Sequence, residues 1–378
     1  MKSSKAKTAL KSLGKRAYLL LFSALLLIAV LVVSGFLLSS PARVVRGYFE
    51  SFAAGDYETA YAYLSAPDSP FISKEAFGDY MRQELAGNMD VANYVIDRTS
   101  FRRLMQTYEV TYILQGESAE DSLRVELVRQ RKKQLLFFNR YKVGVGGMVD
   151  RSCTVYAPEG IELSVDGIAV PESKNAVSEH AHMSAYTIPA IFRGRHRVAA
   201  KGDWFEEIAD EWTLEGKSKE KTLFLLEVGE DTRAYLAENA YNVFTALVAG
   251  AVKGDKLTDI PGITGILTTN AEALGAMKET YRNLSGHVKS QYDGTGLKSV
   301  SFKSFRDDSE SVYLDFDGRY VCAVSFNYTY VMQELDYATG KLTEEAFNNE
   351  REGAVRCAFA REDGGWRIVA LEDYGLYF

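Results

Sequence analysis

VVRGYFESFAAGD (residues 44–56) and VFTALVAGAVKGD (residues 243–255) carry the pattern that decides the fold. In each, apolar residues recur at three- and four-residue spacing, which is typical of an amphipathic helix. Each helix closes on Gly-Asp, a helix stop. More helical sequence follows both, and then stretches that alternate with period two. The repetition predicts that the chain after residue 38 begins and ends with the same kind of α+β unit.

The first unit is expected over residues 41–144. Ser39 and Ser40 before Pro41 form a good helix start, and two further helices are predicted over 57–64 and 73–85. From residue 99 the period changes to two, with strands predicted through 108–114, 123–127 and 135–143. Helices followed by an antiparallel sheet indicate an α+β domain.

The middle of the chain, residues 149–227, reads as short strands separated by glycine turns. A glycine-rich boundary at 144–147 precedes it, and Asp166-Gly167 is a strong signal for a two-residue hairpin. These features predict a small all-β sandwich.

The last unit, residues 230–378, repeats the order of helices and then strands. Strands are expected around 312–316, 322–328 and 355–359, and a final turn at 363–365 leads into Trp366. Cys322 and Cys357 fall on apolar faces of neighbouring strands. Periodicity does not fix strand pairing, so they are either buried thiols or a disulfide.

Residues 17–38, AYLLLFSALLLIAVLVVSGFLL, form an uncharged run long enough for a helix to cross a bilayer. The leader, residues 1–16, carries six basic residues and no acidic one. A basic leader stays in the cytoplasm, so we expect a single-pass anchor with all later domains outside the cell. The alternatives are a cleaved signal peptide, whose apolar core is shorter, and a buried globular helix, which needs no basic leader.

The composition narrows the classes of partner and compartment. The net charge is −7 with a basic leader, so the outer part is acidic, which argues against nucleic acid as a partner. Three cysteines cannot form a disulfide framework for 378 residues. A cysteine-poor outer part suits a Gram-positive bacterium.

Several motifs carry a resemblance to known families. A long helix ending in Gly-Asp, with a sheet closing on GGWRI (364–368), resembles the cone of the nuclear-transport-factor/ketosteroid-isomerase superfold. PARVVRGYFESFAAGDYETAYAYL (41–64) with KKQLLFFNRYKV (132–143) looks like the non-catalytic N-terminal domain of some Gram-positive penicillin-binding proteins. SVDGIAV (164–170), YTIPAIFRGRHRV (186–198) and GDW (202–204) resemble short envelope β-domains.

The order of anchor, cone, β-domain and cone is similar to the teicoplanin-resistance-associated (TcaA-like) membrane protein family of Firmicutes. The resemblance implies a non-enzymatic role at the cell envelope, in wall assembly or antibiotic tolerance. Such proteins often carry a cytoplasmic Cys-x-x-Cys zinc ribbon before the anchor, and this leader has no cysteine.

The residues predict no catalytic, cofactor or metal site. Ser-x-x-Lys occurs without the Lys-Thr-Gly or Ser-Asp-Asn partners of a transpeptidase. His180 and His182 supply at most half of a zinc or copper site, with no third ligand nearby in sequence. An isomerase in a cone cavity would need a buried carboxylate beside a tyrosine, and no such carboxylate can be singled out.

Two groups of residues are candidates for ligand binding. The first is a basic turn that suits anionic lipid headgroups or wall polymers, and it consists of Arg129, Arg131, Lys132 and Lys133. The second is a set of strand tyrosines that suits an aromatic contact surface, and it consists of Tyr313, Tyr320, Tyr328 and Tyr330. A solvated turn is the alternative for the first group. The sequence therefore predicts a binding protein for an envelope protein or an anionic wall polymer, the alternatives being a spacer without ligand and an isomerase-like or hydrolytic enzyme.

Overall fold

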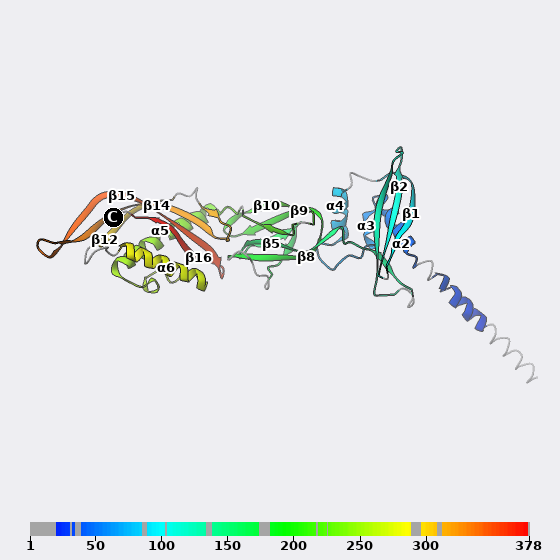
Figure 1. Cartoon of the computed structure of the whole chain (residues 1–378), viewed down its shortest axis with the longest axis horizontal. Helices are drawn as coiled ribbons and strands as arrows, with labels where there is room; N and C mark the ends of the chain where they lie inside the picture. Colours follow the sequence, from blue (N-terminus) through cyan, green and yellow to red (C-terminus); the bar gives the residue numbers. More distant parts are fainter. Residues whose placement is uncertain are drawn as a thin grey trace, which may run out of the picture. The chain divides into compact units, whose positions relative to one another are not determined.

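The computed structural model is shown in Figure 1. It describes residues 20–30, 32–34, 39–84, 89–102, 104–133, 138–173, 182–216, 218–224, 226–288, 296–307 and 312–376. The chain divides into two compact units, residues 1–151 with 190–194, and residues 152–189 with 195–378. The middle β-rich part and the last domain, which are predicted as separate domains, fall mostly in one unit.

Three helices open the first unit: α2 (Pro41–Ala53), α3 (Tyr57–Ala62) and α4 (Lys74–Glu84). The predicted stop after α2 is confirmed, because Gly55 takes a positive φ of 71°, which glycine adopts without strain. Asp56 then caps α3, and its Oδ1 accepts the Thr59 N–H at 3.0 Å. The Gly-Asp pair thus ends one helix and starts the next.

The sheet of the first unit is antiparallel, with strand order β1-β2-β3-β4. Its strands are β1 (Val91–Phe101), β2 (Met105–Leu114), β3 (Glu120–Arg129) and β4 (Tyr141–Val143). Buried residues of α2 pack with the inner face of β2 and β3 to form the core: Val45, Tyr48, Phe49, Phe52; Tyr108, Val110, Val125, Leu127. The prediction of an α+β unit is confirmed here. Most of β1 was not predicted, because this edge strand has no buried residue and therefore no clear alternation.

The β-rich part contains two sheets, with orders β10-β9-β6-β7 and β11-β5-β8. The strands are β5 (Val149–Pro158), β6 (Glu162–Val165), β7 (Ile168–Val170), β8 (Met183–Phe192), β9 (Gly194–Gly202), β10 (Phe205–Leu214) and β11 (Glu220–Thr222). Asp166 and Gly167 have φ of 52° and 77°, and Val165 pairs with Ile168. Positive φ at both central residues is the geometry of a two-residue hairpin turn, as predicted.

The last part contains α5 (Glu230–Lys253), a 3-10 helix (Leu257–Asp259) and α6 (Ala271–Val288), followed by five strands. These are β12 (Gly296–Asp307), β13 (Tyr313–Leu314), β14 (Tyr320–Asp336), β15 (Lys341–Glu362) and β16 (Gly365–Gly375). The main order is β12-β14-β15-β16, and β13 pairs with β14. Helix α5 packs on β12, β14 and β15, while α6 packs on β16 (Figure 1). Gly254 ends α5 with φ of 83°, as Gly55 ends α2.

A cluster of aromatic side chains joins the β9–β10 turn to the last sheet. The Trp204 indole N–H donates to the Tyr320 hydroxyl at 3.3 Å, and the Trp204 and Trp366 rings meet edge to face at 6.2 Å. The Arg361 guanidinium lies 4.7 Å from the Trp204 ring centre and 5.4 Å from that of Trp366. This cation–π arrangement links side chains of the β-rich part and of the last domain within one unit.

The predicted membrane anchor is only partly described. Residues 20–30 and 32–34 are helical, and their large apolar side chains, such as Leu20 and Phe22, are exposed. Within the described part of the chain, no helix has the length and apolar character needed to span a bilayer. The remaining residues of 17–38 lie outside the described residues.

Candidate functional site

The predicted basic turn lies between β3 and β4 in the first unit. Arg129 is the last residue of β3, and Arg131, Lys132 and Lys133 follow it as exposed residues. Residues 134–137 lie outside the described residues. The backbone N–H of Gln130 donates to the Arg140 carbonyl at 2.8 Å, which brings the two ends of the connection together.

The β1–β2 turn meets this connection at the same end of the sheet. The Arg129 N–H donates to the Leu104 carbonyl at 3.0 Å. Phe101 and Leu104 of that turn are 65% and 67% exposed, which is unusual for large apolar side chains. We call the whole surface the basic end: Phe101, Leu104, Arg129, Arg131, Lys132, Lys133, Arg140 and Lys142.

The basic end has little acidic compensation. Residues 98–108 and 127–149 together contain nine Lys and Arg residues and no Asp or Glu. Within the described part of the chain, no ion pair involves Arg129, Arg131, Lys132 or Lys133. The pKa of Lys142 is lowered by partial burial and by the neighbouring Arg140. The structure therefore gathers positive charge on a chain that is acidic as a whole.

The predicted tyrosine surface is corrected by the structure. Tyr320, Tyr328 and Tyr330 are at most 3% exposed, because alternate residues of β14 face the helical side of the sheet. Tyr328 packs 6.3 Å from the Phe302 ring, and Tyr330 stacks on Phe347 at 4.8 Å. These three tyrosines build the core rather than an open contact surface. Tyr313, on β13, is 51% exposed.

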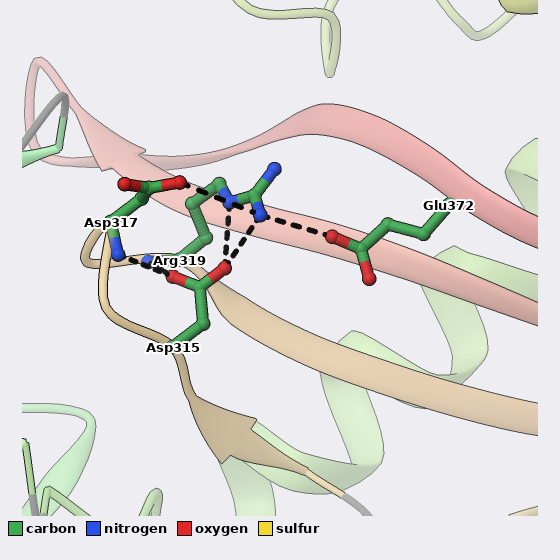
Figure 2. A network of polar contacts seen from close by, with 4 residues as sticks. All are labelled: Asp315, Asp317, Arg319 and Glu372. Carbon is green, nitrogen blue, oxygen red and sulfur yellow. Dashed lines mark hydrogen bonds and ion pairs between the residues drawn. The ribbon is translucent and has the colours of Figure 1, made fainter.

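The acidic residues of the turn between β13 and β14 bind an arginine (Figure 2). Arg319 contacts Asp315 at 2.7 Å, Glu372 of β16 at 3.1 Å and Asp317 at 3.7 Å. Gly318 takes φ of 80°, and a Cβ there would lie 2.7 Å from the His182 carbonyl oxygen. The turn needs glycine for both reasons, and its carboxylates are used to hold the turn on the sheet.

The predicted histidine pair is described only at His182. His180 lies outside the described residues. His182 is 9% exposed, and its backbone N–H donates to the Asp317 carbonyl at 3.0 Å. No group of three or more His, Cys, Asp or Glu side chains is placed to hold a metal ion among the residues that the structure describes.

Burial of His182 predicts a pH dependence of stability. Its pKa is lowered from 6.5, mainly by burial, although Glu362 opposes the shift. In the unfolded chain the ring takes up a proton at its ordinary pKa, so the stabilisation is complete above pH 6.5 and is lost as pH falls toward the lowered value. We expect His182→Gln to reduce the loss of unfolding free energy between pH 7.5 and 5.5, measured by urea denaturation. The same loss in both proteins would contradict this.

The two cysteines of the last sheet face each other. Cys322 on β14 pairs in register with Cys357 on β15, and both are fully buried thiols. The pKa of Cys357 is raised, first by burial and then by Cys322. Burial keeps such thiols in the unreactive protonated form.

Comparisons with known proteins give no family for the chain. No protein-family model matches it, and no curated protein matches it in sequence. One solved structure, an "Ntf2 like protein involved in plasmid conjugation", is similar to it at 9% sequence identity and a TM-score of 0.17. The match covers 86% of this chain and 93% of that one.

Proposed function

We propose that this chain is a non-enzymatic, membrane-anchored protein of the cell envelope that binds an anionic wall polymer or its precursor. The observation that carries the proposal is the basic end, where cations that form no ion pair with another described residue gather at one end of the first sheet. A polyanion that releases counterions on binding such a surface gains affinity from each neutralised charge. A partner protein with an acidic face would use the same charges.

The anchoring part of the proposal is supported by the first 38 residues. The run 17–38 is uncharged, and the basic leader before it predicts a cytoplasmic N-terminus with the later domains outside. The described helical residues of this run expose their leucines and valines. An apolar surface of this kind is stable in lipid or against protein and costly in water.

The family part of the proposal depends on the order of the elements. Helices followed by an antiparallel sheet occur at both ends of the outer chain, with an all-β part between them. This order supports nuclear-transport-factor-like cones and the resemblance to TcaA-like envelope proteins. Nothing in the order of elements requires a catalytic role.

Three carboxylates with low exposure form ion pairs with arginines. Among the residues that the structure describes, Asp150 is the one carboxylate that is buried, and it forms an ion pair with Arg193 at 3.2 Å. An isomerase-like general base would lie beside a tyrosine in an apolar cavity, whereas this carboxylate is held by an arginine. Asp315 and Glu372 are bound to Arg319 in the same way.

An anionic lipid surface is the second candidate ligand. Phe101 and Leu104 are exposed beside the cations, and apolar side chains next to Lys and Arg are typical of proteins that dock on bilayers. The two candidates differ in their need for these side chains. Replacing Phe101 and Leu104 by serine would weaken binding to vesicles and leave binding to a soluble polymer unchanged.

Salt dependence of binding tests the proposal. The full-length chain in detergent is incubated with purified cell wall, before and after chemical removal of its anionic polymer, and the bound fraction is measured at rising salt. We expect binding that requires the polymer and falls by about tenfold or more between 50 and 200 mM salt, as several charge contacts imply. Binding that does not depend on salt, or that survives removal of the polymer, would contradict the proposal.

A further inference from the structure

A cavity opens on the first unit's sheet, at the end where β1 turns into β2. Its volume is about 420 Å³, which is within the range of small-molecule sites. It is lined by side chains of β1, β2, β3 and the β1–β2 turn: Thr99, Ser100, Arg102, Met105, Thr107, Glu109 and Arg124. None of these residues belongs to the basic end.

A shift in strand register shapes this cavity. Arg98 pairs with Tyr108, but Ser100 pairs with Thr107, so Thr99 is an extra residue on β1. The Thr99 hydroxyl donates to the Thr107 carbonyl at 3.3 Å. An extra residue of this kind bends a strand and re-aims its side chains, and bulges are common beside binding sites. Three hydroxyl side chains are thereby gathered in one hollow.

The cavity contains charges of both signs. Arg124 pairs with Glu126 at 2.9 Å, and Glu109 lies opposite Arg124 in the β2–β3 register. Arg102 and Glu109 are exposed, and neither makes an ion pair with another residue that the structure describes. The hollow therefore offers an arginine with hydroxyl groups for an anion and a separate carboxylate for a cation.

We propose that this cavity binds a phosphate ester that also carries an ammonium group. Arg102 and the hydroxyls of Ser100 and Thr107 would hold the phosphate, and Glu109 would hold the ammonium. A plain phosphate is a poorer match, because Glu109 repels it and gains no cationic partner from it. The same chemistry occurs in a zwitterionic lipid headgroup and in an aminoacylated polyol phosphate of a wall polymer.

The proposal does not depend on the basic end, and its test separates the two surfaces. Phosphoethanolamine and glycerol 3-phosphate are titrated separately into the full-length chain in detergent, and the dissociation constants are measured by calorimetry. We expect saturable binding of both, with phosphoethanolamine the tighter by about tenfold, because it makes one more charge-assisted contact.

Two variants distinguish the roles of the charges. Arg102→Gln is expected to weaken both ligands about tenfold, whereas Glu109→Gln is expected to weaken phosphoethanolamine alone and to leave glycerol 3-phosphate unchanged or tighter. Lys132→Gln, a basic-end variant, serves as the matched control and leaves both constants unchanged. All three positions are exposed, so the variants are expected to fold.

Absence of saturable binding, or an equal effect of Glu109→Gln on the two ligands, overturns the proposal. If the proposal is supported, two further binding measurements identify the source of the ligand. One uses vesicles that contain phosphatidylethanolamine, and the other uses a wall polymer with and without its aminoacyl groups. If polymer binding at the basic end fails while these two variants behave as expected, the proposed function is refuted and this site is not.

Discussion

Trp204→Ala is expected to lower the free energy of unfolding of the second unit by about 3–5 kcal/mol. The indole is 3% exposed, so its removal leaves a cavity in a closely packed place. The substitution also removes the ring on which Arg361 lies and the donor to Tyr320. Arg361 would then keep its charge in a partly buried position with less compensation.

Urea denaturation of the wild-type and variant chains measures this loss. Hydrogen exchange adds a local readout, and we expect faster exchange in both β9 and β16, because Trp204 contacts elements of both parts. Trp204→Phe keeps a ring for Arg361 but loses the hydrogen bond, and it should cost less than the alanine variant. A loss below about 1 kcal/mol for Trp204→Ala would show that the aromatic cluster does not hold the unit together.

Neutralising Arg131, Lys132 and Lys133 together is expected to weaken binding to an anionic polymer or surface by about 100-fold. Each exposed cation near such a surface contributes about 1 kcal/mol, so three contribute about 3 kcal/mol. All three side chains are exposed, so glutamine at these positions should leave stability unchanged. Co-sedimentation of the full-length variant with wall polymer measures the change.

The last sheet offers a matched control for this variant. Lys298, Lys303 and Arg306 of β12 are also partly exposed, but each is paired with a glutamate of β15. Their replacement by glutamine removes the same number of positive charges from the chain. Equal losses for the two triple variants would show that binding follows net charge and not the basic end.

The parts of the fold that were predictable are those with local signals. The helix ends at Gly55 and Gly254 follow from glycine's tolerance of positive φ, and the Asp166-Gly167 hairpin follows from the same property at two successive positions. Helices α2 and α5 were predictable from their apolar faces. The α+β character of both ends followed from the change of period along the chain.

The parts that were missed depend on contacts between distant residues. The edge strands β1 and β12 have exposed faces and show little alternation. The tyrosines of β14 alternate correctly, but sequence cannot tell whether their common face is open or covered by a helix, and α5 covers it. The contact of Arg361 with Trp204 joins residues more than 150 positions apart and leaves no local pattern.

The candidate site was predictable only in part. The cations at 129–133 stand out in the sequence, whereas their neighbours Phe101 and Leu104 become visible only through the pairing of β2 with β3. The cavity around Arg102 and Glu109 depends on a one-residue register shift, which single-sequence periodicity does not reveal. A run of Arg-Arg-Leu between two strands was the one signal available for that turn.

The location of the outer domains is the claim on which the proposed function depends most directly. Alkaline phosphatase, which is active only after export, is fused behind Phe378 and its activity is measured in intact cells, with a cytoplasmic reporter fused at the same point for comparison. We predict phosphatase activity in the membrane fraction and no activity of the cytoplasmic reporter. Activity of the cytoplasmic reporter alone, or release of the phosphatase fusion into the medium, would contradict the account.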